Sequence, residues 1–168
     1  MKKRFESLCK VNIKREGIYD LLDWLDSTDF YEAPASTKHH NAFKSGLLQH
    51  SLEVYDQFER ITKSYPEIHI SKETQTIITL FHDFCKINYY KFFSDLILKD
   101  EQFPLTGHGS KSVILILRHM KLTDEEIAAI DAHMGAWDSN KVGTIYTKYP
   151  VAWLLHVADE AATYLVEK

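Results

Sequence analysis

The chain has 168 residues, which is long enough to bury about two thirds of its unfolded surface around one core. Hydrophobic residues make up 45% of it, charges of both signs are mixed, and Gly and Pro are sparse, which excludes disordered, collagen-like and repeat proteins. The net charge of −4 combines a basic start with a more strongly acidic body, which argues against a long nucleic-acid footprint. We therefore expect one globular domain over residues 1–168.

Residues 1–17 form a basic N-terminal segment. We expect this segment to be solvated, and contact with a phosphate or a partner is the alternative. The longest strongly apolar run, residues 113–117, is too short to cross a bilayer, and the start of the chain lacks the apolar centre of a signal peptide. These features predict a cytoplasmic protein that makes no use of a membrane.

Helical periodicity dominates the first half of the chain. Residues 18–25 repeat apolar side chains at helical spacing and predict a short helix that the polar residues 27–29 end. A polar stretch over residues 34–44 follows, and its length is typical of binding loops or lids. A longer helix is expected from about residue 45 to residue 64, with His50 on its apolar side.

The next helix is expected to start after Ser71, a good N-cap residue, and to run to about Lys86. This extent puts His82 and Asp83 in its last turn, near the core. Residues 87–107 are aromatic without helical spacing, which predicts a short hairpin or an ordered loop.

Three further signals complete the expected architecture. A helix resumes near Gly109, the pattern Thr123-x-x-Glu126 is typical of a capping box, and Pro150 suits the first turn of a last helix through about residue 166. The sequence therefore predicts an all-α fold, a compact single-domain bundle of about six helices.

The polar residues expected to point inward form a regular series. After His82 the steps are 26, 25 and 26 residues, or about one helix and one loop each, so successive helices can each deliver a ligand to one centre. The series comprises His50, His82, Asp83, His108, His133 and Asp159. One divalent cation would satisfy these groups together, because a buried carboxylate without a partner is unfavourable by several kcal/mol. The alternative is that each is an ordinary hydrogen-bonded histidine or acid.

The chemistry of these residues limits the metal. The two cysteines, Cys9 and Cys85, fit neither a disulfide framework nor a paired zinc-thiolate site, so we expect packed, reduced thiols. Imidazole and carboxylate ligands favour iron, manganese, cobalt, nickel or zinc over calcium.

The pattern formed by His50, the doublet His82-Asp83 and Asp159 resembles the HD superfamily of metal-dependent phosphohydrolases, over about residues 34–166. The stretch "PASTKHHNAFKSGLLQHSLEV" is similar to the entry of such domains, including one that accompanies some bacterial 3′-to-5′ exoribonucleases, and "HDFCK" is similar to HD-x-x-K. The stretches "GHGSKS", "AHMGAW" and "LLHVADEAATYL" resemble the later ligand-bearing helices of a bacterial and phage branch. The resemblance implies the all-α HD-domain fold.

The resemblance also implies two metal ions. One would be held by His50, His82, Asp83 and Asp159, and Asp83 would bridge to a second ion bound by His108 and His133. Iron or manganese is expected first, with cobalt, nickel, zinc or magnesium as alternatives. A metal-activated hydroxide would then attack the phosphate.

Several residues are expected to act on the substrate. Lys86, one turn after His82, would neutralise charge on the phosphoryl group, although a cation paired with a helix C-terminus is an equal reading. Lys111 and Ser112 begin a helix beside His108, where a phosphate would be favoured. His39 and His40 would reach the site from their loop as phosphate contacts or proton donors, His40 being preferred.

His156, three residues before Asp159, is expected to be an ordinary packed histidine, and orientation of that ligand is the alternative. Aromatic residues could stack a nucleobase, or they could form a core patch; they are Tyr89, Tyr90, Phe92, Phe93 and Trp137.

The expected function is hydrolysis of phosphoester bonds in nucleotides or related small phosphorylated molecules, with Asp83, Lys86 and His40 as catalytic residues. One alternative is a 3′-5′ exonuclease or phosphodiesterase acting on short oligonucleotides or cyclic dinucleotides. Another is a catalytically silent nucleotide-binding sensor. The expected partner is a small phosphorylated substrate, and the oligomeric state stays open.

Overall fold

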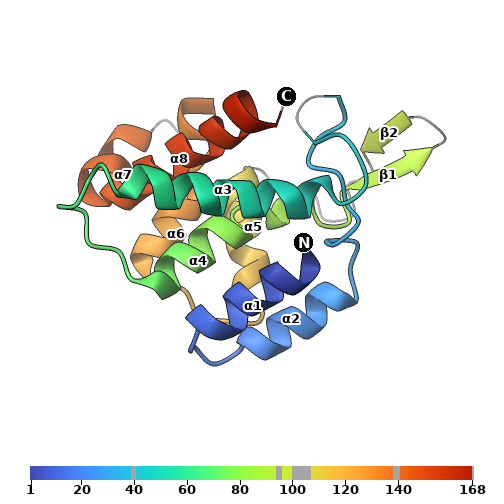
Figure 1. Cartoon of the computed structure of the whole chain (residues 1–168), viewed down its shortest axis with the longest axis horizontal. Coiled ribbons are helices and arrows are strands. Elements are labelled where there is room, and N and C mark those ends of the chain that lie inside the picture. The colour runs from blue at the N-terminus through green and yellow to red at the C-terminus, as the bar shows by residue number, and fades with distance from the viewer. Residues whose placement is uncertain (39–40, 94–95, 100–106, 138–140, 168) are drawn as a thin grey trace.

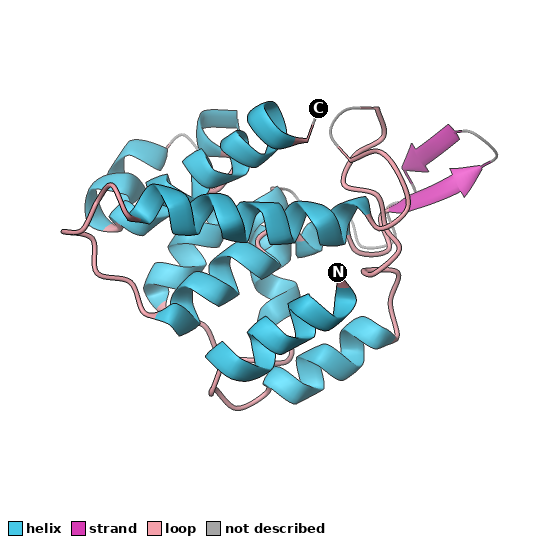
Figure 2. Ribbon diagram, viewed as in Figure 1, coloured by secondary structure: helices cyan, strands magenta, loops and turns pink. Residues whose placement is uncertain are grey.

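The computed structural model describes residues 1–38, 41–93, 96–99, 107–137 and 141–167. Within these ranges, α-helices pack around one core and a two-stranded hairpin lies at one side (Figures 1 and 2). The helices are α1 Lys2–Asn12, α2 Ile18–Asp26, α3 Gly46–Thr62, α4 Lys72–Phe81, α5 His108–Leu117, α6 Asp124–Asp131, α7 Val142–Lys148 and α8 Pro150–Ala161. The all-α fold is confirmed, and the described part of the chain holds eight α-helices where about six were expected.

Helix α3 is the central element of the bundle. It packs against α4 and against α8 (Figure 1), and its buried side includes Leu47, Val54 and Phe58. Burying each such side chain contributes roughly 1.5–3 kcal/mol. His50 lies on the same side and is fully buried, as the periodicity predicts.

The basic N-terminal segment is solvated on one face only: Lys2, Lys3 and Arg4 are exposed, whereas its apolar side chains are buried. Its first part is helix α1, which packs on α2, α3 and α4. Phe5 and Cys9 are fully buried, and the Phe5 ring lies 5.0 Å from Phe30 and 6.1 Å from Phe81, between ring centroids. The physical reason is the i, i+4 spacing of Phe5, Cys9 and Ile13, which gives the charged segment one apolar stripe.

Other local predictions can be compared directly with the structure. Cys9 and Cys85 are both buried and free, as expected. The capping box of Thr123 and Glu126 is formed, and the Ser71 hydroxyl accepts a hydrogen bond from the Thr74 N–H. None of the described helices is long and apolar enough to cross a membrane.

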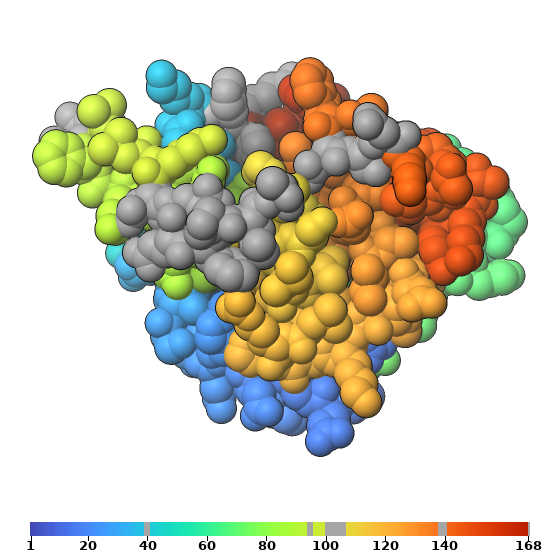
Figure 3. Space-filling view, turned by 180° about the vertical axis from the view of Figure 1, so that it is seen from behind, coloured from blue at the N-terminus to red at the C-terminus, as the bar shows by residue number. Residues whose placement is uncertain are grey.

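The hairpin expected within residues 87–107 is confirmed. Strand β1, Tyr90–Phe93, pairs antiparallel with β2, Leu96–Lys99, so that Tyr90 faces Lys99 and Phe93 faces Leu96. The hairpin extends beyond the helices in Figure 1. From behind, α5 and α6 (yellow to orange) cover the middle of the molecule, between the hairpin and the N-terminal helices (Figure 3).

A buried ion pair ties the start of the chain to the bundle. Glu126 at the start of α6 is fully buried, and its carboxylate accepts hydrogen bonds from Arg15 Nη1 at 2.6 Å and from Arg15 Nη2 at 3.1 Å. The same carboxylate accepts from the Thr74 hydroxyl of α4 at 3.1 Å. Arg15 therefore holds the segment after α1 against both α4 and α6.

Replacing Arg15 tests this junction. Arg15→Met leaves the Glu126 charge buried without its cation, and we expect the free energy of unfolding to fall by about 3 kcal/mol. The matched control is Arg4→Met, because Arg4 pairs with Asp56 at the surface and such a pair contributes under about 1 kcal/mol. Urea denaturation of the two variants measures the difference; equal losses would contradict the buried role of Arg15.

Candidate metal centre

The doublet His82-Asp83 lies where α4 ends. The helix stops at Phe81, earlier than the predicted Lys86, with His82 as its C-cap and Asp83 at the start of a 3-10 turn, η1, over Phe84–Lys86. The turn is fixed from the side, because the Cys85 N–H donates a hydrogen bond of 2.9 Å to the Ser112 hydroxyl. This change of direction lets two consecutive side chains both point into the interior, where each is buried.

Three buried histidines each have their Nδ1 atom within hydrogen-bond distance of an oxygen. His82 Nδ1 lies 2.9 Å from the Thr79 carbonyl oxygen, His133 Nδ1 lies 2.7 Å from the Ile130 carbonyl oxygen, and His50 Nδ1 lies 3.0 Å from Glu167 Oε1. Carbonyl and carboxylate oxygens can only accept, so each Nδ1 carries the hydrogen. In the neutral ring, each Nε2 is then left with a lone pair.

These lone pairs converge with two carboxylates. His50 Nε2 lies 3.3 Å from His82 Nε2 and 3.1 Å from Asp159 Oδ1. Asp83 Oδ2 lies 3.5 Å from His50 Nε2 and 3.6 Å from His82 Nε2. Ligand atoms about 2.1 Å from one ion are separated by about 3 to 3.5 Å at tetrahedral or right angles. The spacing therefore fits ligands around a shared cation.

His133 completes the cluster. Its Nε2 is buried, lies 3.5 Å from Asp83 Oδ1, and has no hydrogen-bond partner within the described part of the chain. A buried polar atom without a partner is unusual in a native protein and points to an ion or water. Together His50, His82, Asp83, His133 and Asp159 form two overlapping groups able to hold a metal. These residues fit a divalent cation.

The electrostatics keep the carboxylates ionised. Burial would raise the pKa of Asp83, but the Lys86 ammonium, 2.6 Å from Asp83 Oδ2, and the neighbouring histidines hold it well below its usual value. Burial acts the same way on Asp159, and the hydrogen bond with His50 lowers its pKa instead. Both acids are therefore anionic at neutral pH and can act as ligands.

The two facing histidines differ in charge. Burial lowers the pKa of His82 to about 4, so this ring is neutral. Burial also lowers the pKa of His50, but its hydrogen bonds to Asp159 and Glu167 outweigh that effect and raise it to about 10. In the metal-free protein a proton on His50 thus supplies the positive charge that the cluster requires.

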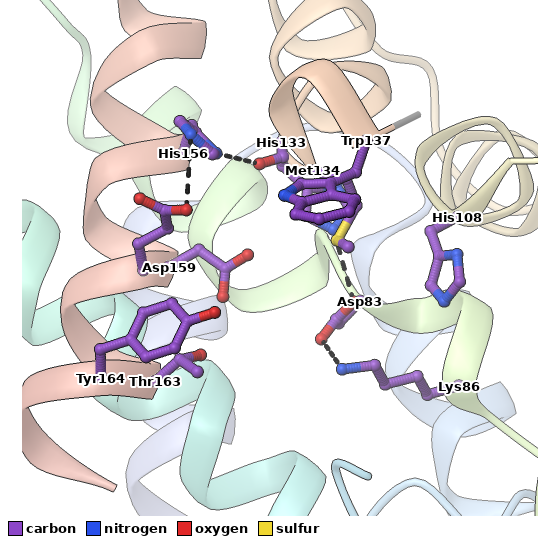
Figure 4. Close-up of a pocket in the computed structure, with 11 residues that line it drawn as sticks. Asp83, Lys86, His108, His133, Met134, Trp137, His156, Asp159, Thr163 and Tyr164 are labelled. Carbon is purple, nitrogen blue, oxygen red and sulfur yellow. Dashed lines mark hydrogen bonds and ion pairs between the residues drawn. The ribbon is translucent and has the colours of Figure 1, made fainter. Parts of the chain in front are cut away.

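The cluster opens into a pocket with a cavity volume of about 160 Å³ (Figure 4). Asp159 and Tyr164 lie on the α8 side, Lys86 and His108 lie across from them, and Trp137 lies above. The lining residues are Asp83, Lys86, His108, His133, Met134, Trp137, His156, Asp159, Glu160, Thr163 and Tyr164. A small molecule entering this pocket would meet the carboxylates and Lys86 directly.

The structure brings together five of the six predicted metal ligands. His108, the sixth, is exposed at the start of α5; it lines the same pocket but lies outside the metal-binding groups found among the described residues.

The predicted phosphate-binding residues fall in different places. Lys86 lines the pocket, as expected. Lys111 and Ser112 are buried and lie outside the lining of the pocket: the Lys111 ammonium is 5.0 Å from the Tyr89 ring centroid, and Ser112 supports the η1 turn. Because α5 turns both side chains inward, neither of them lines the pocket in which a phosphate contact was expected. His39 and His40 lie outside the described residues.

His156 is partly buried and stacks on the Tyr146 ring, with 6.1 Å between the ring centroids, which is consistent with a packed histidine. Its Nδ1–H donates a hydrogen bond of 2.7 Å to the backbone oxygen of His133, so it orients the segment that carries another ligand. Gly135 permits this contact, since its φ is +63° and an added Cβ would lie 2.8 Å from His156 Cε1.

Glu167 has no counterpart in the sequence predictions. An acid in the last residues of the chain carries no signal of burial, and it reaches His50 only because the helix after α8 widens into a π turn, η3, over Ala162–Val166. A helical wheel continued from α8 would not have placed it correctly.

Helical bundles build metal sites from side chains on facing helices, and this bundle brings together three imidazoles and two carboxylates that could hold a metal ion. The model of the HD domain family matches residues 47–163, which is more than half of the chain. The chain therefore belongs to the HD domain family, within the superfamily of metal-dependent phosphohydrolases. Comparisons with curated proteins and with solved structures give no match.

Metal binding can be tested through stability. A divalent ion that binds the folded state, supplied at about 100 times its dissociation constant, stabilises that state by about 2.7 kcal/mol. We expect Mn²⁺ to raise the melting temperature of metal-free protein by roughly 5 to 10 °C. Asp159→Asn should lose most of this shift, whereas His69→Ala, at an exposed histidine, should keep it. An equal shift in both variants would argue against the cluster as the binding site.

Proposed function

We propose that the protein hydrolyses phosphoester bonds of nucleotides or related small phosphorylated molecules in a metal-dependent reaction. The observation that carries this proposal is the convergence of three imidazole Nε2 atoms and two carboxylates on one side of a pocket that also holds a buried lysine. A divalent cation bound there would lower the pKa of a water molecule and neutralise phosphate charge.

Lys86 supports the choice of a phosphate substrate. Its side chain lines the pocket, and although burial alone would lower its pKa, the Asp83 carboxylate raises that pKa above the ordinary value for lysine. The ammonium is therefore charged at neutral pH and can stabilise negative charge that develops on a phosphoryl oxygen. Its pairing with Asp83 also keeps the amine within reach of the ligand cluster.

The pocket supports a small substrate. A volume of about 160 Å³ is below the range of roughly 300 to 1,000 Å³ typical of sites that enclose a whole drug-sized ligand. Trp137 is 89% exposed and lines the pocket, and Tyr164 lines it from the opposite side. A phosphate held by Lys86 would leave the rest of the molecule against these rings, which favours a nucleotide.

The basic N-terminal segment gives the oligonucleotide alternative little support. Three of its cations are paired within the chain, Lys2 with Asp26, Arg4 with Asp56 and Arg15 with Glu126. A cation that is already paired with a carboxylate of the same chain is less available to neutralise a phosphate of a nucleic-acid backbone.

The number of ions can be decided by stoichiometry. The two-ion arrangement implied by the family resemblance requires His108, which lies outside the cluster and would serve only a second ion. It predicts two bound ions per chain in the native protein and one in His108→Ala, measured by elemental analysis after dialysis. A stoichiometry of one in both proteins would establish a single-ion centre.

Catalysis can be tested with two variants of the doublet segment. Against a panel of nucleoside phosphates, cyclic dinucleotides and short oligonucleotides, the Mn²⁺-loaded protein should turn over at least one nucleotide. Asp83→Ala should lose both metal and turnover. Lys86→Met should keep the metal and lower kcat by about 10² to 10³-fold, as loss of a charge-stabilising donor does.

The same panel tests His40. His40→Ala should lower turnover if the histidine donates a proton to the leaving group. Full activity of Asp83→Ala would contradict the proposed function.

A further inference from the structure

We propose that Glu167 is a positioning residue of the metal centre: its buried carboxylate accepts the Nδ1–H of His50 and thereby aims His50 Nε2 at the metal. This inference rests on the proposed function only in that the centre must bind a metal. Glu167 does not touch the other four ligands in any contact found in the structure's described residues, and it would act through His50 alone.

The contact is close and enclosed. The two carboxylate oxygens lie 3.0 and 3.2 Å from His50 Nδ1, and both side chains are fully shielded from solvent. Burying an ionised carboxylate is strongly unfavourable unless it is paired and hydrogen bonded. The bond to His50 is therefore the interaction that makes this burial possible.

In residues 164–167 the apolar side chains are exposed and the charged one is buried, which is the reverse of the usual pattern. Tyr164, Leu165 and Val166 are 68%, 72% and 42% exposed, whereas the acid that follows them is buried. A segment that only packed against the bundle would bury its apolar residues and expose its charge. The conformation instead serves the placement of Glu167.

The π turn explains how Glu167 reaches α3. The Glu167 N–H donates to the Ala162 carbonyl at 3.0 Å, five residues back. In an α-helix, residues five apart lie about 140° apart around the axis. The wider π turn brings residue 167 back toward the side of Ala162, which is fully buried, and η3 packs against α3. Such turns are frequent at functional sites.

His50 has a special need for this partner. His82 and His133 lie just after helix ends, and each bonds a carbonyl of the preceding last turn, that of Thr79 or of Ile130. His50 lies inside α3, where the carbonyls are engaged in the helix. Its Nδ1–H thus requires an acceptor from elsewhere, and the residue that supplies it lies 117 positions away.

A carboxylate partner also affects how strongly a histidine binds a metal ion. Hydrogen bonding to a carboxylate fixes the tautomer and orientation of a metal-binding histidine and makes its free nitrogen a stronger ligand. Loss of such a partner typically weakens metal affinity by about 10 to 100-fold. Glu167 is therefore expected to set the affinity of the centre rather than to contact the substrate.

The test compares three variants of full-length protein. Mn²⁺ affinity of metal-free protein is measured by calorimetry for Glu167→Ala, for Glu167→Gln and for the neighbouring control Leu165→Ala. We expect Glu167→Ala to bind about 10 to 100-fold more weakly. The amide oxygen of Glu167→Gln can still accept the Nδ1–H and should restore most of the affinity, and Leu165→Ala should match the native protein.

A second readout needs no metal. In metal-free protein, ¹⁵N NMR of the imidazoles should show a protected His50 Nδ1–H in the native protein and in Glu167→Gln, and should lose this protection in Glu167→Ala. Native-like affinity of Glu167→Ala, or affinity of Glu167→Gln as weak as that of Glu167→Ala, would overturn the proposal. If the native protein itself bound no divalent ion, the proposed function would fail, whereas the NMR comparison would still test the Glu167 contact.

Discussion

The centre depends on one electrostatic constraint. Two imidazole nitrogens that carry lone pairs face each other across 3.3 Å in a buried space, and this arrangement is stable only with positive charge between or beside them. In the metal-free protein the proton on His50 supplies that charge. A divalent cation would supply more, because it would also satisfy Asp83, Asp159 and His133 Nε2, which has no hydrogen-bond partner among the described residues. The rest of the fold serves to hold these groups in place.

The bundle meets this constraint by ending its helices at the site. Asp83 follows α4 and His133 follows α6, so the end of each helix offers a candidate ligand and a last-turn carbonyl that orients a histidine. Helix α3 contributes His50 from its interior, and α8 contributes Asp159 one turn before the helix widens. The 3-10 turn η1 and the π turn η3 thus lie at the candidate metal centre, while the α-helices form the surrounding core.

Much of the fold was predictable because the relevant patterns are local. Helical spacing placed His50 on the inner face, and the regular steps after His82 indicated one ligand from each successive helix. Side-chain direction at an element boundary was not predictable, because it depends on tertiary contacts. His108 therefore lies outside the cluster, and Lys111 and Ser112 turn inward although they were expected to meet a phosphate. The apolar stripe that includes Phe5 is visible in the sequence and indicates a packed helix α1, whereas the basic residues of the same segment favoured a solvated one.

The distance along the chain between His50 and Glu167 has a consequence for biosynthesis. A ribosome completes α3 and α4 long before it adds Asp159 in α8 and Glu167 after η3. During that interval His50 and His82 are present without Asp159 or Glu167, so a nascent chain holds only part of the ligand set. The complete set of candidate ligands is therefore present only after α8 has been added, and a chain that ends before Asp159 would lack part of it.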